Sequence, residues 1–389
     1  MKSIKISNSV ESLRYSVIRE MGQLAQGMND AIMLTIGEPD LDTPPSVVAR
    51  AFSDALNGST HYTPNQGDPD LIAALAQFMT HELGVDILPT SVLITTGAMG
   101  ALLAAFRTLL DPDDEVIVIE PYYPDYVGHI TLARGIIKPV KSTLENDFIP
   151  SPEDIEAAIG SKTKIILLNS PNNPTGAIIP KNVLSAIAEI AIKHDLLVIS
   201  DEVYDHITYR EKPSSIYAIA GMAERTVVIN SFSKAYAMTG WRVGFAVGPE
   251  SIIRQMVKVV TYSTACASSV GQRAALAALQ LDSKWFDQLT GIFRERVELV
   301  CNRLDQIPGI RFVRPGGGFY VFFEIDLKGR SSRDFAIDLL KSKALAVVPG
   351  YAFGLSCDRF MRIACTVPIE RLSQAMDRLE SYMTSRASG

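Results

Sequence analysis

The chain has 389 residues, of which 47% are hydrophobic and 21% charged, as is typical of a globular protein. Its formal net charge of −6 at pH 7 argues against a nucleic-acid partner, because proteins that bind nucleic acids carry clustered positive charge. A chain of this length exceeds the usual size of a single core, so we expect two domains or one large domain with an appendage.

The sequence contains no run of about 18 apolar residues, and its N-terminus lacks the uninterrupted apolar segment of a secretory signal. We therefore expect no membrane-spanning helix. The four cysteines form no CxxC pair, and no His/Cys cluster has the spacing of a zinc site, so we expect reduced thiols and no metal. Together these features predict a cytoplasmic protein.

Apolar residues at helical spacing, from Val10 to Leu24, predict an amphipathic helix near residues 10–26. A short strand and a Gly/Pro-rich turn follow in residues 30–45. From about residue 69, helical segments such as "LIAALAQFMTHEL" alternate with short apolar strands such as "EVIVIE" and "LLVIS". This alternation is typical of a mainly parallel sheet covered by helices on both faces.

After about residue 280 the pattern changes to a long charged helix, a strand pair around "RPGGGFYVFFEI", another helix and the strand "RFMRIACTV". This is an α+β pattern. We therefore predict an α/β protein with an N-terminal arm and part of the small domain in residues 1–44. Residues 45–280 would form the large domain, and residues 281–389 the smaller C-terminal domain.

Polar residues follow several of the large-domain strands, and ligands of parallel sheets bind beyond the carboxyl ends of strands. Gly97 follows the strand "LITT" and opens a helix, a geometry that offers backbone N–H groups to an anion, although many such turns bind nothing. "NSPNNPTG" follows the next relevant strand and is equally compatible with an ordinary loop. Asp201 ends "LLVIS", where a carboxylate needs a cation or several donors, or else serves as a helix N-cap.

Lys234 lies in "SFSKAYAMTGWRVG", between apolar segments, and is either a surface lysine or a nucleophile held in a site. Taken with Asp201, the Gly97 turn and Arg242, it suits pyridoxal 5′-phosphate (PLP). The lysine would form a Schiff base with the cofactor, the aspartate would pair with the pyridinium nitrogen, and the turns and Arg242 would hold the phosphate. The chain lacks the glycine-rich patterns of dinucleotide-binding and P-loop proteins.

Over nearly its whole length the chain resembles the class I/II aminotransferases, PLP enzymes of fold type I. The resemblance runs through "TIGEPDLDTP", "HYTPNQGDPDL", "NPTG", "SDEVY", "SFSKAYAMTGWRVG" and "RFMRIACTVP". It is strongest toward the bacterial aspartate, aromatic and acetyl-diaminopimelate aminotransferases. The resemblance implies a ping-pong transfer of an amino group from an L-amino acid to a 2-oxo acid.

The resemblance also implies roles for individual residues. Lys234 would be the Schiff-base lysine and proton shuttle, Asp201 the partner of the pyridinium nitrogen, and Tyr204 a donor to the phenolate oxygen of the cofactor. The other cofactor-binding residues would be Gly97, Ala98, Met99, Tyr123, Asn173, Ser231, Ser233 and Arg242. Ala98 and Met99 replace the hydroxyl residues of some family members, so hydroxyl contacts to the phosphate would come from the two serines. Tyr123 would stack on the ring, although it also fits a core tyrosine.

For the substrate, the resemblance implies that Arg362 grips the α-carboxylate, near Asn173 and the backbone of Gly37. Tyr62 would reach the phosphate of the neighbouring subunit, which implies a homodimer. Two other functions stay open: a PLP-dependent carbon–sulfur β-lyase on the same scaffold, and a cofactor-sensing regulator. The amino donor also stays open, because neither Arg14 nor Arg273 is selected by any spacing as a partner for an acidic side chain.

Overall fold

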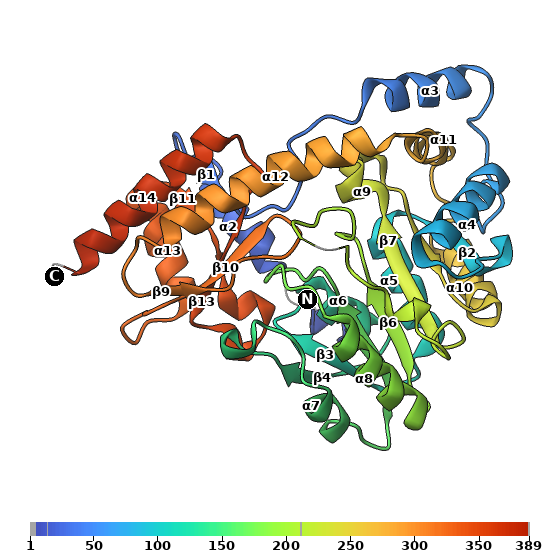
Figure 1. The fold of residues 1–389 in the computed structure, drawn as a ribbon, viewed down its shortest axis with the longest axis horizontal. Helices are drawn as coiled ribbons and strands as arrows, with labels where there is room; N and C mark the ends of the chain where they lie inside the picture. Colours follow the sequence, from blue (N-terminus) through green and yellow to red (C-terminus); the bar gives the residue numbers. More distant parts are fainter. Residues whose placement is uncertain (1–4, 14, 211, 388–389) are drawn as a thin grey trace.

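A computed structural model describes residues 5–13, 15–210 and 212–387. Figure 1 shows two units, a large one built around a central sheet and a smaller one, with the long helix α12 (Ser283–Leu304) running along both. Within the described ranges, no helix combines the length and the apolar character needed to cross a membrane.

The central sheet of the large unit has seven strands in the order β2-β8-β7-β6-β5-β3-β4. All neighbours are parallel except β8, which runs antiparallel to both β2 and β7. The mainly parallel α/β fold predicted from the sequence is therefore confirmed. The strands are β2 (Val92–Thr95), β3 (Glu115–Glu120), β4 (Ile136–Lys141), β5 (Thr163–Asn169), β6 (Leu197–Asp201), β7 (Thr226–Ser231) and β8 (Gly244–Val247).

Both faces of this sheet are buried. In β5, Ile165 and Leu167 pack in one hydrophobic cluster with α5, α6 and α10, whereas Ile166 and Leu168 pack in another with α8. Because successive residues of a strand point to opposite faces, this alternation explains why the strands are apolar at nearly every position. The helices of this unit are α3 (Pro45–Leu56), α4 (Pro69–Leu83), α5 (Gly97–Leu109), α6 (Asp125–Leu132), α7 (Pro152–Ala157), α8 (Lys181–Lys193), α9 (Phe232–Ala235), α10 (Glu250–Ser263) and α11 (Ser269–Ala278).

The smaller unit contains a separate antiparallel sheet, in the order β12-β13-β10-β9, and a parallel pair formed by β1 and β11. Its strands and helices are β1 (Ile32–Met33), β9 (Ile310–Phe312), β10 (Tyr320–Ile325), β11 (Leu345–Ala346), β12 (Val348–Pro349), β13 (Phe360–Ala364), α2 (Val17–Ala25), α13 (Ser332–Lys343) and α14 (Ile369–Ala387). The β1–β11 pair joins the N-terminal segment to this unit. The exact boundaries at residues 44/45 and 280/281 stay predictions.

The single helix predicted near residues 10–26 is wrong. Helix α1 (Asn8–Glu11) ends at Ser12, and α2 begins after Ser16, whose backbone is extended. Serine side chains compete for backbone hydrogen bonds and so favour helix ends over helix interiors. The apolar residues of this segment also do not form a single buried face, because Met21 is buried while Val10 and Leu24 are exposed.

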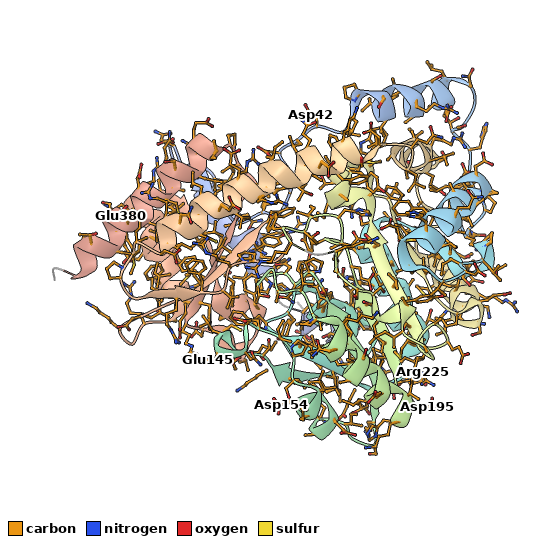
Figure 2. All side chains as sticks on the ribbon, viewed as in Figure 1. Asp42, Glu145, Asp154, Asp195, Arg225 and Glu380 are labelled. Carbon is orange, nitrogen blue, oxygen red and sulfur yellow. The ribbon has the colours of Figure 1, made fainter. Side chains whose placement is uncertain are left out.

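The two edges of the central sheet differ in character. At the edge where β6 and β7 begin, Asp195 and Arg225 form an ion pair at 3.1 Å, seen at the lower right of Figure 2. At the opposite edge the same two strands end in Asp201 and Ser231, both buried. The polar residues predicted to form a site follow this second edge. In the described part of the chain, short 3₁₀ helices complete the fold: η1 (Pro89–Ser91), η2 (Leu144–Asn146), η3 (Ile216–Ala218), η4 (Thr239–Trp241), η5 (Gly350–Phe353) and η6 (Leu355–Cys357).

Candidate active site

Lys234 lies on the short helix α9, directly after β7, where the chain turns at the end of the sheet. Its Nζ donates a hydrogen bond to the carbonyl of Gly37 at 2.6 Å. Burial lowers the pKa of Lys234 to about 8; Glu38 and Asp201 oppose this shift, while Arg242 and Arg362 add to it. The side chain therefore points inward, and its amine is neutral at a much lower pH than that of a surface lysine.

Asp201, the last residue of β6, is 4% exposed. Tyr126 donates its hydroxyl hydrogen to Oδ2 at 2.7 Å, and the Val203 N–H is 3.4 Å from Oδ1. Burial raises the pKa of Asp201 to about 6, while the Tyr126 hydrogen bond and the charge of Lys234 lower it. The described residues directly after Asp201 form turns at 203–206 and not a helix, so the alternative interpretation as a helix N-cap is wrong. The carboxylate is instead a buried charge held by one tyrosine and by the field of Lys234.

An anion cradle lies at the start of α5. Gly97, Ala98 and Met99 form the first turn of this helix, and the N-cap residue Thr96 makes no side-chain capping bond to them. Gly97 has a φ of +72°, and a Cβ added there would lie 2.7 Å from Nη2 of Arg242. The N-terminus of a helix and an adjacent guanidinium both favour a negative charge.

Two serines and Arg242 complete this cradle. The Ser231 hydroxyl donates to Ser233 Oγ at 2.8 Å, and the Ser233 N–H donates to Ser231 Oγ at 3.0 Å. Arg242 donates from Nη1 to the Thr239 carbonyl at 2.8 Å, and within the described residues no carboxylate pairs with it. The structure therefore brings the predicted Gly97 turn and Arg242 together, with the predicted serines at the end of β7.

Arg362 lies in the middle of β13, in the smaller unit, and is 1% exposed. Nη1 donates to Asn173 Oδ1 at 2.9 Å, and Nη2 donates to the Thr35 carbonyl. Nε is buried and has no hydrogen-bond partner among the described residues. Burial lowers the pKa of Arg362. A buried guanidinium with no carboxylate partner in the described chain is costly, which marks it as a site for an anion.

Aromatic rings enclose this guanidinium. Its Cζ lies 4.4 Å from the centre of the Tyr320 ring and 5.1 Å from that of Phe353. The Tyr320 hydroxyl is 3.0 Å from the Tyr204 hydroxyl, and a Cβ added at Gly37 would collide with Tyr320. Glycine at position 37 therefore lets the backbone approach Tyr320 closely, while its predicted contact with the α-carboxylate stays a prediction.

Tyr123 and Asn173 lie beside these groups. The Tyr123 hydroxyl donates to Asp125 Oδ2 at 2.6 Å, and its ring meets that of Tyr126 edge-on at 5.4 Å. The Asn173 N–H donates to Asn169 Oδ1 at 2.8 Å, which orients the loop after β5. The "NPTG" segment is therefore ordered against the end of the sheet rather than being a free surface loop.

Two predicted or considered residues lie elsewhere. Tyr62 is 88% exposed in the connection between α3 and α4, so it does not join this site within one chain. Arg273 contacts Asp54, Asp68 and Asp70 on the outer helices, which assigns it to an ion-pair cluster. Arg14 lies outside the described residues. Within those residues, no group of three or more His, Cys, Asp or Glu side chains is arranged to hold a metal ion.

Sequence reasoning missed Tyr126 and Tyr320. Tyr126 is three residues after Tyr123, at the spacing that places two side chains on one side of a helix turn, and this was the available signal. Tyr320 follows "GGGF" in an apolar strand, where nothing distinguishes it from a core aromatic residue.

Residues 29–379 match the family described as aminotransferase class I and II. The chain is 37% identical to aromatic-amino-acid aminotransferase 2 of Thermococcus litoralis, covering 98% of this chain and 99% of the relative. It is 38% identical to an aspartate aminotransferase of Thermotoga maritima, covering 98% and 100%. Among solved structures, the aspartate aminotransferase of Thermus thermophilus with maleate superposes with a TM-score of 0.92 at 35% identity, covering 97% and 100%. The chain therefore belongs to the class I and II aminotransferases and is an aminotransferase of fold type I.

Proposed function

We propose that this aminotransferase uses pyridoxal 5′-phosphate, bound at the end of the central sheet, to move an amino group from an L-amino acid to a 2-oxo acid. One observation carries the proposal. Lys234 and Arg362 come from different units, yet both donate to carbonyls of the same short segment, at Gly37 and Thr35. The two carbonyls that hold the reactive amine and the uncompensated guanidinium are thus two residues apart in the chain. An α-amino acid requires such a neighbouring pair, one for its amino group and one for its carboxylate.

The residues present fit the cofactor. Its phosphate would lie on the backbone of Gly97, Ala98 and Met99, with Ser231, Ser233 and Arg242 around it. This set supplies N–H donors, hydroxyls and a cation, and within the described residues Arg242 has no competing carboxylate. Asp201 would face the pyridine nitrogen, Asn173 and Tyr204 the phenolic oxygen, and Tyr123 the face of the ring.

When bound, pyridoxal phosphate supplies a carbonyl carbon that amines attack and a ring that accepts electrons from the substrate Cα. Lys234 contributes an amine that is largely neutral above about pH 8, so it can act as a nucleophile and then carry a proton to and from Cα. Asp201 is ionised above about pH 6 and places a negative charge at the buried end of the site.

Arg362 would orient the amino acid. Two parallel hydrogen bonds from a planar guanidinium match a carboxylate, and the rings of Tyr320 and Phe353 fix the plane of that guanidinium. The Arg362 hydrogen bond to Asn173 connects this substrate end to the loop expected to hold the cofactor. Asn173 would thus contact both molecules.

The β-lyase alternative uses the same lysine, aspartate and arginine. Transamination is favoured because the relatives at 37–38% identity over nearly the full length are aspartate and aromatic aminotransferases. The same relatives disfavour the regulator alternative. A half-reaction screen tests the choice: the enzyme is mixed with single amino acids, and the change in cofactor absorbance is followed. We expect a stable change that only a 2-oxo acid reverses. Spontaneous recovery with release of ammonia would indicate a lyase.

The same screen addresses the amino donor. The relatives' names include both aspartate and aromatic amino acids, so donors of each kind are compared with an aliphatic one. An acidic donor would need a cation for its side chain, and Arg273 is already engaged by three carboxylates. The pattern of half-reaction rates therefore measures which side chain the site accepts.

We also propose a homodimer in which Tyr62 reaches the phosphate of the partner's site. The exposure of this large aromatic side chain, 88%, supports the proposal, since it is not packed against the described residues of its own chain. Mixing inactive Tyr62→Ala and Lys234→Ala variants tests it, because hybrid dimers contain one intact site. Proven subunit exchange without recovered activity would show that each site is complete in one chain. A cytoplasmic location stays a prediction, supported by the four free cysteines.

A further inference from the structure

A second contact between the two units lies beside the site, where the end of β3 meets residues 350–357. This segment, which we call the 350s loop, contains η5 and η6 and comes shortly before β13, the strand of Arg362. Glu120, the last residue of β3, is 3% exposed and points into the 350s loop. A buried carboxylate must be satisfied by donors, and the donors of Glu120 come from the smaller unit.

Ser356 provides these donors. Its backbone N–H and its hydroxyl both donate to Oε1 of Glu120, each at 2.6 Å. Within the described residues, no Lys, Arg or His forms an ion pair with Glu120, so this double contact is its main compensation. Hydrogen bonds to a charged acceptor are shorter and stronger than neutral ones.

The 350s loop is shaped to receive the carboxylate. A Cβ added at Gly354 would collide with the Glu120 carboxyl group, and Gly354 has a φ of +134°, which L side chains rarely adopt. A Cβ at Gly350 would likewise collide with the backbone of Cys357 and Phe360. The loop is therefore closely folded, and one of its two glycines makes room for Glu120.

The other side of the 350s loop faces Arg362. Phe353 is fully buried, with its ring 5.1 Å from the Arg362 Cζ, and its carbonyl accepts a hydrogen bond from the Tyr122 N–H at 3.0 Å. Glu120, at the end of β3, thus contacts the loop at Ser356, and Tyr122, two residues later, contacts it at Phe353. The second of these contacts holds Phe353 itself, whose ring lies beside the guanidinium.

We propose that Glu120 is a positioning residue for substrate binding: by fastening the 350s loop to the central sheet, it holds Phe353 against Arg362 and so fixes the plane in which the guanidinium meets the α-carboxylate. This inference rests on the proposed role of Arg362. It assigns a function to a carboxylate that touches neither the expected cofactor nor the substrate. Because the α-carboxylate is common to all amino donors, the effect of Glu120 is independent of the substrate side chain.

The test compares Glu120→Ala and the milder Ser356→Ala with the wild-type holoenzyme. KM and kcat are measured for an acidic and an aromatic donor, and Kd for the carboxylate inhibitors succinate and 3-phenylpropionate. Loss of the double contact should raise KM and Kd about 5- to 20-fold, with kcat within about twofold. Glu120→Gln keeps an acceptor oxygen and should recover most of the affinity. The Glu120→Ala/Ser356→Ala double variant should have KM and Kd values no higher than those of Glu120→Ala, because the two substitutions affect the same contact.

Glu115→Ala is the matched control. Glu115 lies at the opposite end of β3 and pairs with Lys138 at 3.1 Å, so its loss removes a glutamate contact from the same strand without touching the 350s loop. KM and Kd should stay at the wild-type values. The cofactor absorbance of every variant is recorded as well, because Tyr123 follows Glu120 closely in the chain.

Three outcomes would overturn the inference. If Glu120→Ala and Ser356→Ala lower the unfolding midpoint but leave KM and Kd within twofold, Glu120 is only a stabilising contact. If cofactor absorbance changes, the effect passes through Tyr123. If only one class of donor is affected, Glu120 acts on the side-chain pocket. Arg362→Lys in the same assay distinguishes a failure of this inference from a failure of the proposed function. Unchanged inhibitor binding in Arg362→Lys would refute the role of Arg362 itself.

Discussion

The two halves of the site treat buried charge differently. On the central-sheet side, Asp201 accepts a hydrogen bond from Tyr126 and feels the charge of Lys234, so its buried carboxylate is partly compensated within the chain, although burial still raises its pKa to about 6. On the side of the smaller sheet, Arg362 has carbonyl, amide and aromatic neighbours, but no carboxylate pairs with it within the described residues. The buried carboxylate of one half thus has partners within the chain, whereas the buried guanidinium of the other lacks an anion.

This difference follows the lifetimes of the two ligands. A group that stays bound through every turnover can be held beside a carboxylate that the chain itself partly compensates, as at Asp201. A substrate that enters and leaves must bring its own counter-charge, and the uncompensated guanidinium gives it a strong, directional partner. Substitutions on the central-sheet side should therefore slow the chemical step, whereas substitutions on the side of the smaller sheet should weaken substrate binding.

Lys234→Ala should have the largest effect. Turnover should fall to background, because the nucleophile and proton carrier are lost, while the cradle at Gly97 and Arg242 can still hold the cofactor non-covalently. In the wild-type protein, borohydride reduction followed by peptide mapping should place the cofactor on Lys234. Lys258→Ala serves as the control and should retain activity. A label on Lys212 or Lys258 would contradict the assignment.

Asp201→Ala should come next. Without the buried carboxylate, the pyridine nitrogen loses its counter-charge, and proton removal from the substrate should slow by roughly two to four orders of magnitude. KM should change much less, because Arg362 is untouched. Asp201→Glu should keep part of the rate. Single-turnover kinetics with a deuterated amino donor measures this step directly, and near-normal turnover in Asp201→Ala would show that the carboxylate is structural.

Arg362→Lys tests the other half. The lysine keeps the charge but loses the two parallel hydrogen bonds, which are worth about 1.5–3 kcal/mol in a charge-assisted pair, so kcat/KM should fall at least about tenfold. The loss should be similar for acidic and aromatic donors, and cofactor absorbance should not change. Arg311→Lys, at a small-sheet arginine that is already paired with Glu324, is the control. A loss confined to acidic donors would place Arg362 in the side-chain pocket.

How far the sequence could predict this site depends on the range of each interaction. The strands and the polar residues directly after them follow from local patterns, and the structure brings Asp201, Lys234 and the Gly97 turn to one edge as expected. Tyr126 and Tyr320 were missed because their partners are distant in the chain: Tyr126 meets Asp201, and Tyr320 meets Tyr204. Neither tyrosine stands in a pattern that specifies a partner. The break between α1 and α2 was missed because apolar spacing continues through residues that end helices.

Substitution of Glu202 should have the smallest effect on activity of the changes considered. It tests how completely the central-sheet side compensates its buried charges. This neighbour of Asp201 is buried, and among the described residues its carboxylate accepts hydrogen bonds only from hydroxyls, of Ser200 at 2.7 Å and Ser215 at 2.6 Å. Burial raises the pKa of Glu202 to about 7. Between its unfolded pKa of about 4.5 and this value, the folded protein binds more protons than the unfolded chain, so this contribution to stability is full below the lower value and is lost as pH rises through the higher one.

Glu202→Gln removes this titration. Between about pH 5 and pH 8, the wild-type protein should lose on the order of 2 kcal/mol more unfolding free energy than the variant, as measured by urea unfolding at each pH. Glu115→Gln is the control: hydrogen bonds from Thr163 and Lys138 lower the pKa of Glu115, so this group is ionised in both the folded and the unfolded protein over this pH range, and the variant should keep the wild-type pH dependence. Turnover of Glu202→Gln should stay near the wild-type rate. If wild type and Glu202→Gln show the same pH dependence, the pKa of Glu202 is not raised in the folded protein, and the hydroxyls of Ser200 and Ser215 compensate its buried charge.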